Sequence, residues 1–280
     1  MSTSMLYRFT AFSDRDNGGN PAGVWVGNAL PEVAEMQRIA AEVGFSETAF
    51  IAPASGVVRD VRYFSPEAEV SFCGHATIAS GVLLGMRDGT GEYRLQTQVG
   101  EVPVRVRQEN DHFVAALTSV EPRHELPSDS LLNAALETLS WNRSELDDKL
   151  PPAKAYAGAW HLIIAVKDRA RLQSLDYAFD DLKALMLEHE LTTLQLVWRE
   201  SPTVFHARNP FPVGGVVEDP ATGASAAALG GYLRSAGHMA VPGSLLIHQG
   251  VDMGRPSEIT VDVPQHGGIV VSGTAVSLDG

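Results

Sequence analysis

The sequence predicts an α+β fold of two pseudo-symmetric halves, each a curved, mostly antiparallel and barrel-like sheet around a central buried helix. Many short alternating segments and few amphipathic helices favour this class over an alternating doubly wound sheet. Residues 78–86 and 226–233 are apolar or small on every side and carry no charge until Arg87 and Arg234. A helix without a polar face belongs inside a domain, so each half has one candidate central helix.

In the first half, residues 6–12 alternate and include aromatic side chains, which predicts a strand, and residues 23–26 predict a second strand. The loop at residues 13–21 is dense in Gly and Asn and suits either a long turn or close approach of a ligand. Residues 31–43 predict an amphipathic helix that begins at Pro31 and ends before Gly44. Its inner stripe is expected to comprise Val33, Met36, Ile39, Ala40 and Val43.

Residues 45–51 predict a strand that places the carboxylate of Glu47 among apolar neighbours. Such an acid often faces solvent, but inside a dry cleft it can serve as a general acid/base. Further alternating strands are expected at residues 57–64, 93–106 and 112–117. We place the halves at residues 1–120 and 121–280, joined by a crossing at residues 122–127, and the last strands can return to the first half.

In the second half, residues 131–139 predict a helix capped by Ser128 or Asp129, and residues 179–190 predict a second amphipathic helix. Strands are expected at residues 160–166, 194–198 and 203–207, and in glycine-punctuated segments between residues 244 and 276. Gly237 is placed to end the central helix of this half.

The composition narrows the class of protein. The 280 residues carry 34 acidic and 21 basic side chains, a formal net charge of −13, which argues against a nucleic-acid partner. The single cysteine excludes an intrachain disulfide and a multi-thiolate metal site. The chain shows no signal peptide and no apolar run long enough to span a bilayer, so we expect a cytoplasmic protein with no membrane partner.

Both central helices begin at a glycine-containing corner. The first corner, Cys73-Gly74-His75, would place a thiol and an imidazole where the first free N–H groups of a helix point, a position that suits an anion. A Cys and a His two residues apart usually diverge, so thiolate catalysis is not expected, and His75 is either a functional group or a capping or core histidine. Gly74 would permit close backbone approach or a positive φ.

The second corner contains Asp219 and Pro220, and Asp219 is either a functional group or a simple N-cap. The remaining histidines have no metal-ligand spacing, and no nucleotide-binding fingerprint is present. The sequence therefore predicts no metal site and no nucleotide cofactor.

Five short motifs occur in order over nearly the whole chain, and together they resemble the phenazine-biosynthesis PhzF-like family, within the diaminopimelate-epimerase-like fold. The motifs occupy residues 19–24, 46–50, 73–77, 218–223 and 249–257. The resemblance implies a homodimer and cofactor-free, metal-free chemistry in a cleft between two halves. It implies that Glu47 is the acid/base and that His75 and Asp219 assist it. It also implies that Gly74 and Gly223 offer backbone N–H groups to a substrate carboxylate, in a binding site completed by Asn20, Ala224, Ser225, Gln249 and Gly250.

The function expected from this resemblance is a cofactor-independent isomerase that moves a proton on a small anionic substrate similar to trans-2,3-dihydro-3-hydroxyanthranilate. The family usually has Ser where this chain has Ala224, with Ser225 following, which bears on whether the phenazine-pathway substrate is used. Two-thiol racemisation is excluded because the chain has one cysteine. The alternatives are epimerisation with Glu47 and His75 on opposite faces of the substrate, or a non-catalytic protein that binds a small molecule.

Overall fold

The computed structural model describes residues 4–279 and divides the chain into two compact units. Unit 1 comprises the chain up to Thr118 together with the C-terminal segment from Ser272, and unit 2 comprises Ser119–Val271. The chain therefore enters unit 2 once and returns to unit 1 for its last strand. No helix among residues 4–279 combines the length and apolarity that crossing a membrane requires.

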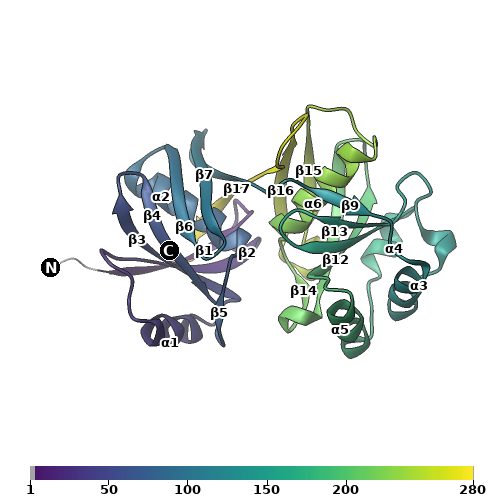
Figure 1. The fold of residues 1–280 in the computed structure, drawn as a ribbon, viewed down its shortest axis with the longest axis horizontal. Helices are drawn as coiled ribbons and strands as arrows, with labels where there is room; N and C mark the ends of the chain where they lie inside the picture. Colours follow the sequence, from purple (N-terminus) through teal and green to yellow (C-terminus); the bar gives the residue numbers. More distant parts are fainter. Residues whose placement is uncertain (1–3, 280) are drawn as a thin grey trace. The chain divides into compact units, whose positions relative to one another are not determined.

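Unit 1 is a closed barrel around one helix (Figure 1). Its elements are β1 (Met5–Ala11), β2 (Asn20–Val26), α1 (Val33–Val43), β3 (Glu47–Ser55), β4 (Val58–Phe64), β5 (Glu69–Val70), α2 (Gly74–Asp88), β6 (Gly91–Thr97), β7 (Gly100–Glu109), β8 (His112–Thr118) and β17 (Val270–Ser277). The pairings run β1–β2–β3–β4–β6–β7–β8–β17 and close on β1, with β5 added to β4. Only β2–β3 and β4–β6 are parallel among the registers described, and the helices α1 and α2 connect them.

Unit 2 has a comparable order of elements. They are β9 (Arg123–Glu125), α3 (Asp129–Thr138), a 3₁₀ turn at Arg143–Glu145, β10 (Ala153–Tyr156), β11 (Trp160–Val166), α4 (Arg169–Gln173), α5 (Phe179–Glu188), β12 (Thr193–Arg199), β13 (Val204–Phe211), a 3₁₀ turn at Pro212–Gly214, β14 (Val216–Asp219), α6 (Gly223–Ser235), β15 (Gly243–Gln249), a 3₁₀ turn at Val251–Met253 and β16 (Ser257–Val263). The strands pair in the order β9–β10–β11–β12–β13–β15–β16, with β14 added to β13.

The two units repeat one plan, which confirms the predicted α+β fold. In unit 2 the parallel pairs are β11–β12, joined through α4 and α5, and β13–β15, joined through α6. The elements of the two units therefore correspond in chain order: β11 to β2, β12 to β3, β13 to β4, α6 to α2, and β15 to β6. Each central helix therefore follows a short added strand and begins at the same kind of corner in its sheet.

Small residues allow the central helices to lie against the surrounding strands. Residues 75–85 of α2 are all buried, as the absence of charge in this segment predicts, but Met86, the last residue of the predicted apolar run, is 54% exposed. A Cβ atom at Gly81 would lie 2.7 Å from the Cβ of Ala115, and one at Gly85 would lie 2.6 Å from Val106 Cγ1. A larger residue at either position would push α2 away from β7 and β8.

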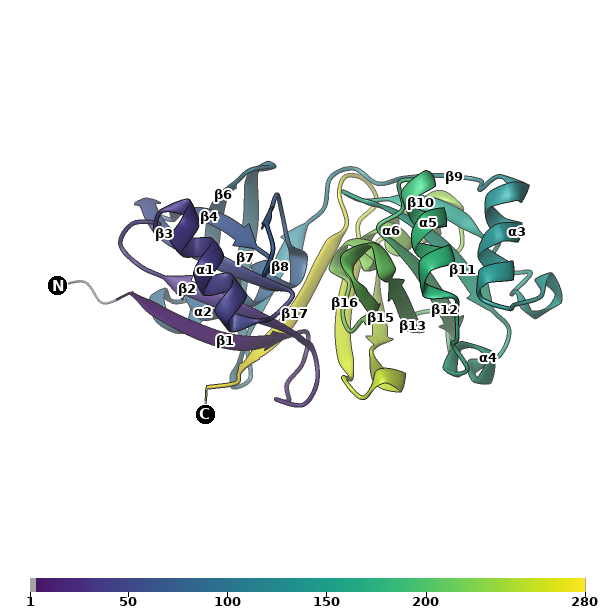
Figure 2. The same cartoon turned by 90° about the horizontal axis from the view of Figure 1, so that it is seen from below.

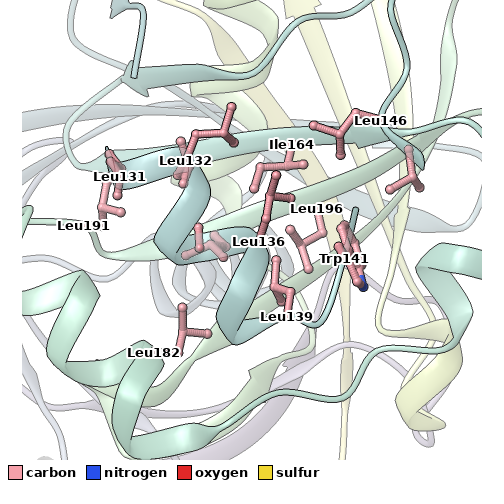
Figure 3. Close-up of a cluster of buried hydrophobic side chains, with 14 of the residues drawn as sticks. Leu131, Leu132, Leu136, Leu139, Trp141, Leu146, Ile164, Leu182, Leu191 and Leu196 are labelled. Atoms are coloured by element: carbon pink, nitrogen blue, oxygen red, sulfur yellow. The ribbon is translucent and has the colours of Figure 1, made fainter. Parts of the chain in front are cut away.

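The outer faces of the sheets carry the amphipathic helices (Figures 1 and 2). In unit 1, Met36 and Ala40 of α1 pack on Trp25, Phe50 and Phe64. In unit 2, α3 and α5 cover β11 and β12 through a larger cluster of leucines with Trp141 (Figure 3). Because these helices pack on the outer faces of the sheets, they do not cover the N-terminal ends of α2 and α6, where the candidate site residues lie.

Several predicted details are confirmed and others are wrong. Gly44 is left-handed at the end of α1, Ser128 caps α3 by accepting from Leu131 N, and Gly237 has a φ of 73° after α6. Helix α1 begins at Val33 rather than Pro31, and Val33 is 50% exposed because it lies in the first turn, beyond the edge of the sheet-facing stripe. The predicted crossing at residues 122–127 contains β9, and β10, β14 and α4 were not predicted.

Candidate functional site

The site in unit 1 begins at the N-terminal end of β3, where Glu47 is the first residue of the strand. Its register partner on the parallel strand β2 is Ala22. The Glu47 side chain is 19% exposed, so it is neither on the open surface nor sealed in the core. A carboxylate in this position keeps a path to a ligand and has lost most of its surrounding water.

His75, the second residue of α2, is the nearest partner of Glu47. Its Nε2 lies 3.3 Å from Glu47 Oε2 and 3.4 Å from Ser46 Oγ. On the other side of the ring, Nδ1 lies 3.2 Å from Nδ2 of the buried Asn20. An amide N–H can only donate, so we assign Nδ1 as the acceptor and place the ring proton on Nε2, facing the Glu47 carboxylate.

Cys73 is close to the same ring, which corrects the expectation that the thiol and the imidazole diverge. Cys73 Sγ lies 3.4 Å from His75 Nδ1 and 3.8 Å from Nε2. The reason is a change of backbone conformation, since Cys73 is the extended N-cap residue (φ −142°, ψ 118°) and His75 is already helical. Side chains two residues apart diverge along a continuous helix, but these two converge because the helix begins between them.

The start of α2 is not capped by its own N-cap residue. Cys73 makes no side-chain capping bond to the first-turn N–H groups. Gly74 does not have a positive φ, contrary to one of its expected roles, but a Cβ at Gly74 would meet nothing within 4 Å. The absent side chain therefore leaves space above the positive end of the helix dipole, where an anion is stabilised.

The corner of unit 2 is held by a network of side chains. Asp219 is the last residue of β14, and the N-cap of α6 is Thr222, so Asp219 is not the helix cap. Thr222 Oγ1 donates to Asp219 Oδ2 over 2.5 Å. Gln249 Nε2 donates to the Asp219 carbonyl over 2.7 Å and to Thr222 Oγ1 over 2.9 Å, and Gln249 Oε1 accepts from Thr222 N over 3.1 Å. Fully buried Gln249 thus orients the start of α6.

The first turn of α6 contains the remaining predicted site residues. Gly223 is its first residue, Ala224 is partly exposed, and Ser225 is fully buried. Ser225 Oγ donates to Thr222 O over 3.0 Å and accepts from Asn209 Nδ2 over 2.8 Å, so its hydroxyl is used inside the unit. Gly250 is left-handed, and a Cβ there would lie 2.2 Å from Arg255 O, so this glycine is required by the backbone.

The structure therefore groups the predicted residues by unit. Glu47, His75, Asn20 and Gly74 come together at the ends of β2, β3 and α2 in unit 1. The others gather at the start of α6 in unit 2, and they are Asp219, Gly223, Ala224, Ser225, Gln249 and Gly250.

Sequence reasoning did not find two further partners of the central helices. Tyr63 OH lies 2.7 Å from Thr77 Oγ1 in α2, and burial raises the pKa of Tyr63, so the phenol stays protonated. Asn209 on β13 makes the equivalent contact to Ser225 in α6. Polar residues within largely apolar strands were the available signal. Because periodicity does not show which helix residue faces them, that signal was not decisive.

Comparison with known proteins places this geometry in context. A family model described as phenazine biosynthesis-like protein matches residues 9–280. A protein of Escherichia coli K12 named uncharacterized isomerase YddE is 31% identical over 98% of this chain and 96% of its own length. A Pseudomonas chlororaphis protein named trans-2,3-dihydro-3-hydroxyanthranilate isomerase is 29% identical over 88% of this chain and 86% of its own length.

Solved structures show the same fold. The Bacillus anthracis phenazine biosynthesis protein of the PhzF family superposes with a TM-score of 0.86 at 24% identity, covering 99% of this chain and 98% of its own. A hydroxyproline epimerase from Agrobacterium vitis superposes with a TM-score of 0.66 at 13% identity, covering 99% of this chain and 93% of its own. At these identities the likeness concerns the fold alone.

Proposed function

We propose, from the premise that this chain belongs to the phenazine biosynthesis-like family, that it moves a proton on a small carboxylate-bearing substrate by acid/base catalysis through Glu47. The chain is an isomerase, as its relatives are named. The name of the Pseudomonas chlororaphis relative suggests a substrate similar to trans-2,3-dihydro-3-hydroxyanthranilate.

The observation that carries the proposal is the contact of 3.3 Å between Glu47 Oε2 and His75 Nε2 at the start of the buried helix α2. In the proposed reaction Glu47 removes a proton from one substrate carbon and returns it to another as the double bond moves. The Nε2–H of His75 donates to the carboxylate and keeps its second oxygen aimed at the substrate. Asn20 holds the ring in that tautomer from the Nδ1 side.

We assign the binding of the substrate carboxylate to the N-terminus of α2, in the unit that carries Glu47, where Gly74 leaves open space. In unit 2 the corresponding position is the first turn of α6, which contains the N–H groups of Gly223 and Ala224 and whose orientation Gln249 and Asp219 maintain. Backbone N–H groups and the helix dipole together favour a carboxylate at such a position. Ser225 does not supply a free hydroxyl for this purpose, because Asn209 and Thr222 already engage it.

The contact between Glu47 and His75 also separates isomerisation from the epimerase alternative. Two groups that act on opposite faces of one carbon must leave room for the substrate between them. Glu47 and His75 are instead in direct contact at 3.3 Å, which fits one acid/base group and its helper. The geometry therefore favours transfer of a proton by a single carboxylate.

The test is proton exchange at carbon. Candidate substrates are incubated in heavy water with the parent protein and with Glu47→Gln, and deuterium at carbon is measured. We expect incorporation with the parent and a loss of at least about 100-fold with the variant, because general acid/base catalysis typically contributes that much.

Glu200→Gln is the matched control, because Glu200 also forms a close Glu–His contact, 2.6 Å from Nε2 of His206, which lies on β13 of unit 2. It should exchange as the parent does. Equal exchange by the parent and Glu47→Gln would refute the role of Glu47, and tight binding without exchange in either protein would support a non-catalytic binding protein.

A further inference from the structure

Three side chains of the unit 1 site have donor atoms suited to a metal ion. Glu47, Cys73 and His75 each offer one such atom, and these atoms all lie within 4.8 Å of one another. Among residues 4–279 this is the one group of three or more Cys, His, Asp or Glu side chains that meets this spacing. Cys73 and His75 are buried, so two of the three donors are already held in place by the core.

The spacing of the donors fits tetrahedral zinc. Bonds of about 2.0 to 2.3 Å at tetrahedral angles place neighbouring ligand atoms about 3.3 to 3.7 Å apart. Glu47 Oε2 lies 3.3 Å from His75 Nε2, and Cys73 Sγ lies 3.8 Å from the same nitrogen. A small rotation of the imidazole is needed, because the sulfur is 0.4 Å nearer to Nδ1, 3.4 Å against 3.8 Å.

The chemistry of the donors selects the class of ion. A thiolate and an imidazole bind borderline and soft cations such as Zn²⁺ and Co²⁺, whereas Mg²⁺ and Ca²⁺ prefer oxygen donors. Three protein ligands leave a fourth position for water, the arrangement found at exchangeable zinc sites. Asn20 can serve either tautomer of His75, because turning its amide by half a rotation replaces the Nδ2 donor at Nδ1 with the Oδ1 acceptor.

We propose that Cys73, His75 and Glu47 form a three-ligand site for Zn²⁺ whose occupation switches off the acid/base pair. The inhibitory part of this inference rests on the proposed function. On binding, the Cys73 thiol releases its proton to solvent, the ring proton of His75 moves from Nε2 to Nδ1, and the freed lone pairs on sulfur and Nε2 bind the ion. Glu47 Oε2 is then held by the metal, and the carboxylate that would accept a substrate proton is no longer available as a base.

Cobalt gives a test that does not require turnover. Thiolate-bound Co²⁺ shows a sulfur-to-metal charge-transfer band in the near ultraviolet, and the chain has one cysteine, so the band reports on Cys73 alone. We expect the band to appear on titration of the parent with Co²⁺, to disappear when Zn²⁺ displaces the cobalt, and to persist in excess Mg²⁺. The variants Cys73→Ala and His75→Ala should abolish it and weaken Zn²⁺ binding, measured by calorimetry, at least about tenfold.

His206→Asn is the matched control, because it removes a histidine that contacts a carboxylate elsewhere in the chain, and it should leave the band unchanged. Circular dichroism verifies that each variant is folded. Absence of the band in the folded parent, or Zn²⁺ binding that Cys73→Ala does not weaken, would overturn the site. If Zn²⁺ binds but proton exchange by the parent continues at the same rate, the site stands and its inhibitory role is refuted. If the parent shows no exchange at all, the proposed function fails while the cobalt result stands independently.

Discussion

The contact between Tyr63 and Thr77 predicts an asymmetry in unfolding free energy between two conservative substitutions. Thr77 Oγ1 donates to the Cys73 carbonyl over 2.6 Å, so its one hydroxyl proton is committed. Tyr63 OH must therefore be the donor in the contact of 2.7 Å to Thr77 Oγ1. The Tyr63 side chain is 1% exposed and Thr77 is fully buried, so water cannot replace a lost partner.

The magnitudes follow from what each substitution leaves behind. Tyr63→Phe removes the donor and leaves Thr77 still bonded to Cys73, so we expect a loss of about 1 kcal/mol, the typical net value of one hydrogen bond. Thr77→Val leaves the Tyr63 hydroxyl buried without a partner, and we expect a loss of about 2 to 3 kcal/mol. In the double variant the stranded hydroxyl is gone, so it should be no less stable than Thr77→Val alone.

The assay is native-state hydrogen exchange of peptides from α2, which measures the opening free energy of unit 1 separately from that of unit 2. Chemical unfolding followed by circular dichroism gives a second measure. Strictly additive losses, or a larger loss for Tyr63→Phe than for Thr77→Val, would show that the phenol is not the donor and would refute the argument.

Two further predictions concern unit 2. Burial lowers the pKa of His161 to about 3, whereas the ordinary pKa of histidine is about 6.5. Between these two pH values the unfolded chain therefore binds one more proton than the folded chain. The free energy of unfolding falls as the pH is lowered through this window. Chemical unfolding at pH 7 and at about pH 5 measures this loss of unfolding free energy. The loss should be smaller for His161→Asn than for the parent, by up to about 1.4 kcal/mol per pH unit. Equal losses in the two proteins would contradict this prediction. Gly250→Ala should lower the free energy of unfolding by at least about 2 kcal/mol, because the added Cβ would lie 2.2 Å from Arg255 O and 2.8 Å from Pro220 O. Gly254 has a similar φ, but a Cβ there would meet no atom within 4 Å, so Gly254→Ala should lower it by only about 1 kcal/mol. Thermal melting measures both losses. Equal losses for the two glycines would show that the Gly250 contact relaxes.

Much of the fold could be predicted because its clearest sequence patterns extend over many consecutive residues. A run without charge predicts a buried helix whatever lies around it, and the structure buries residues 75–85 of α2 as expected. The strand Trp160–Val166 was likewise clear, because residues 162–166 form an unbroken apolar run. The strands β9 and β10 were missed because three or four residues are too few to show a period of two.

The site was harder to predict because its contacts depend on where the backbone changes conformation. Asp219 before Pro220 has the form of a helix start, yet β14 continues to Asp219 and the helix begins at Gly223. The approach of Cys73 to His75 likewise depends on an extended residue directly preceding a helical turn. An inference from sequence spacing presumes one regular backbone geometry, so it cannot describe such a corner. For the same reason Glu47, Cys73 and His75, which come together from β3 and the start of α2, form no recognisable metal-binding motif in the sequence.

Comparison of the two repeats bears on which unit would carry the proposed acid/base chemistry. The first residue of β3 is Glu47, which lies opposite Ala22 in the parallel pair with β2. The corresponding first residue of β12 is Thr193, which lies opposite His161 in the parallel pair with β11. The second residue of α2 is His75, while that of α6 is Ala224. Each repeat has a side-chain contact between a strand and the first turn of its central helix, Tyr63 to Thr77 in one and Asn209 to Ser225 in the other. Unit 2 therefore keeps the scaffold but has no acid/base side chain at either of these positions, so a mechanism with two symmetry-related bases is not available at them. The proposed chemistry, in which a single carboxylate in unit 1 takes a proton from one carbon and delivers a solvent-exchangeable proton to another, fits this asymmetry.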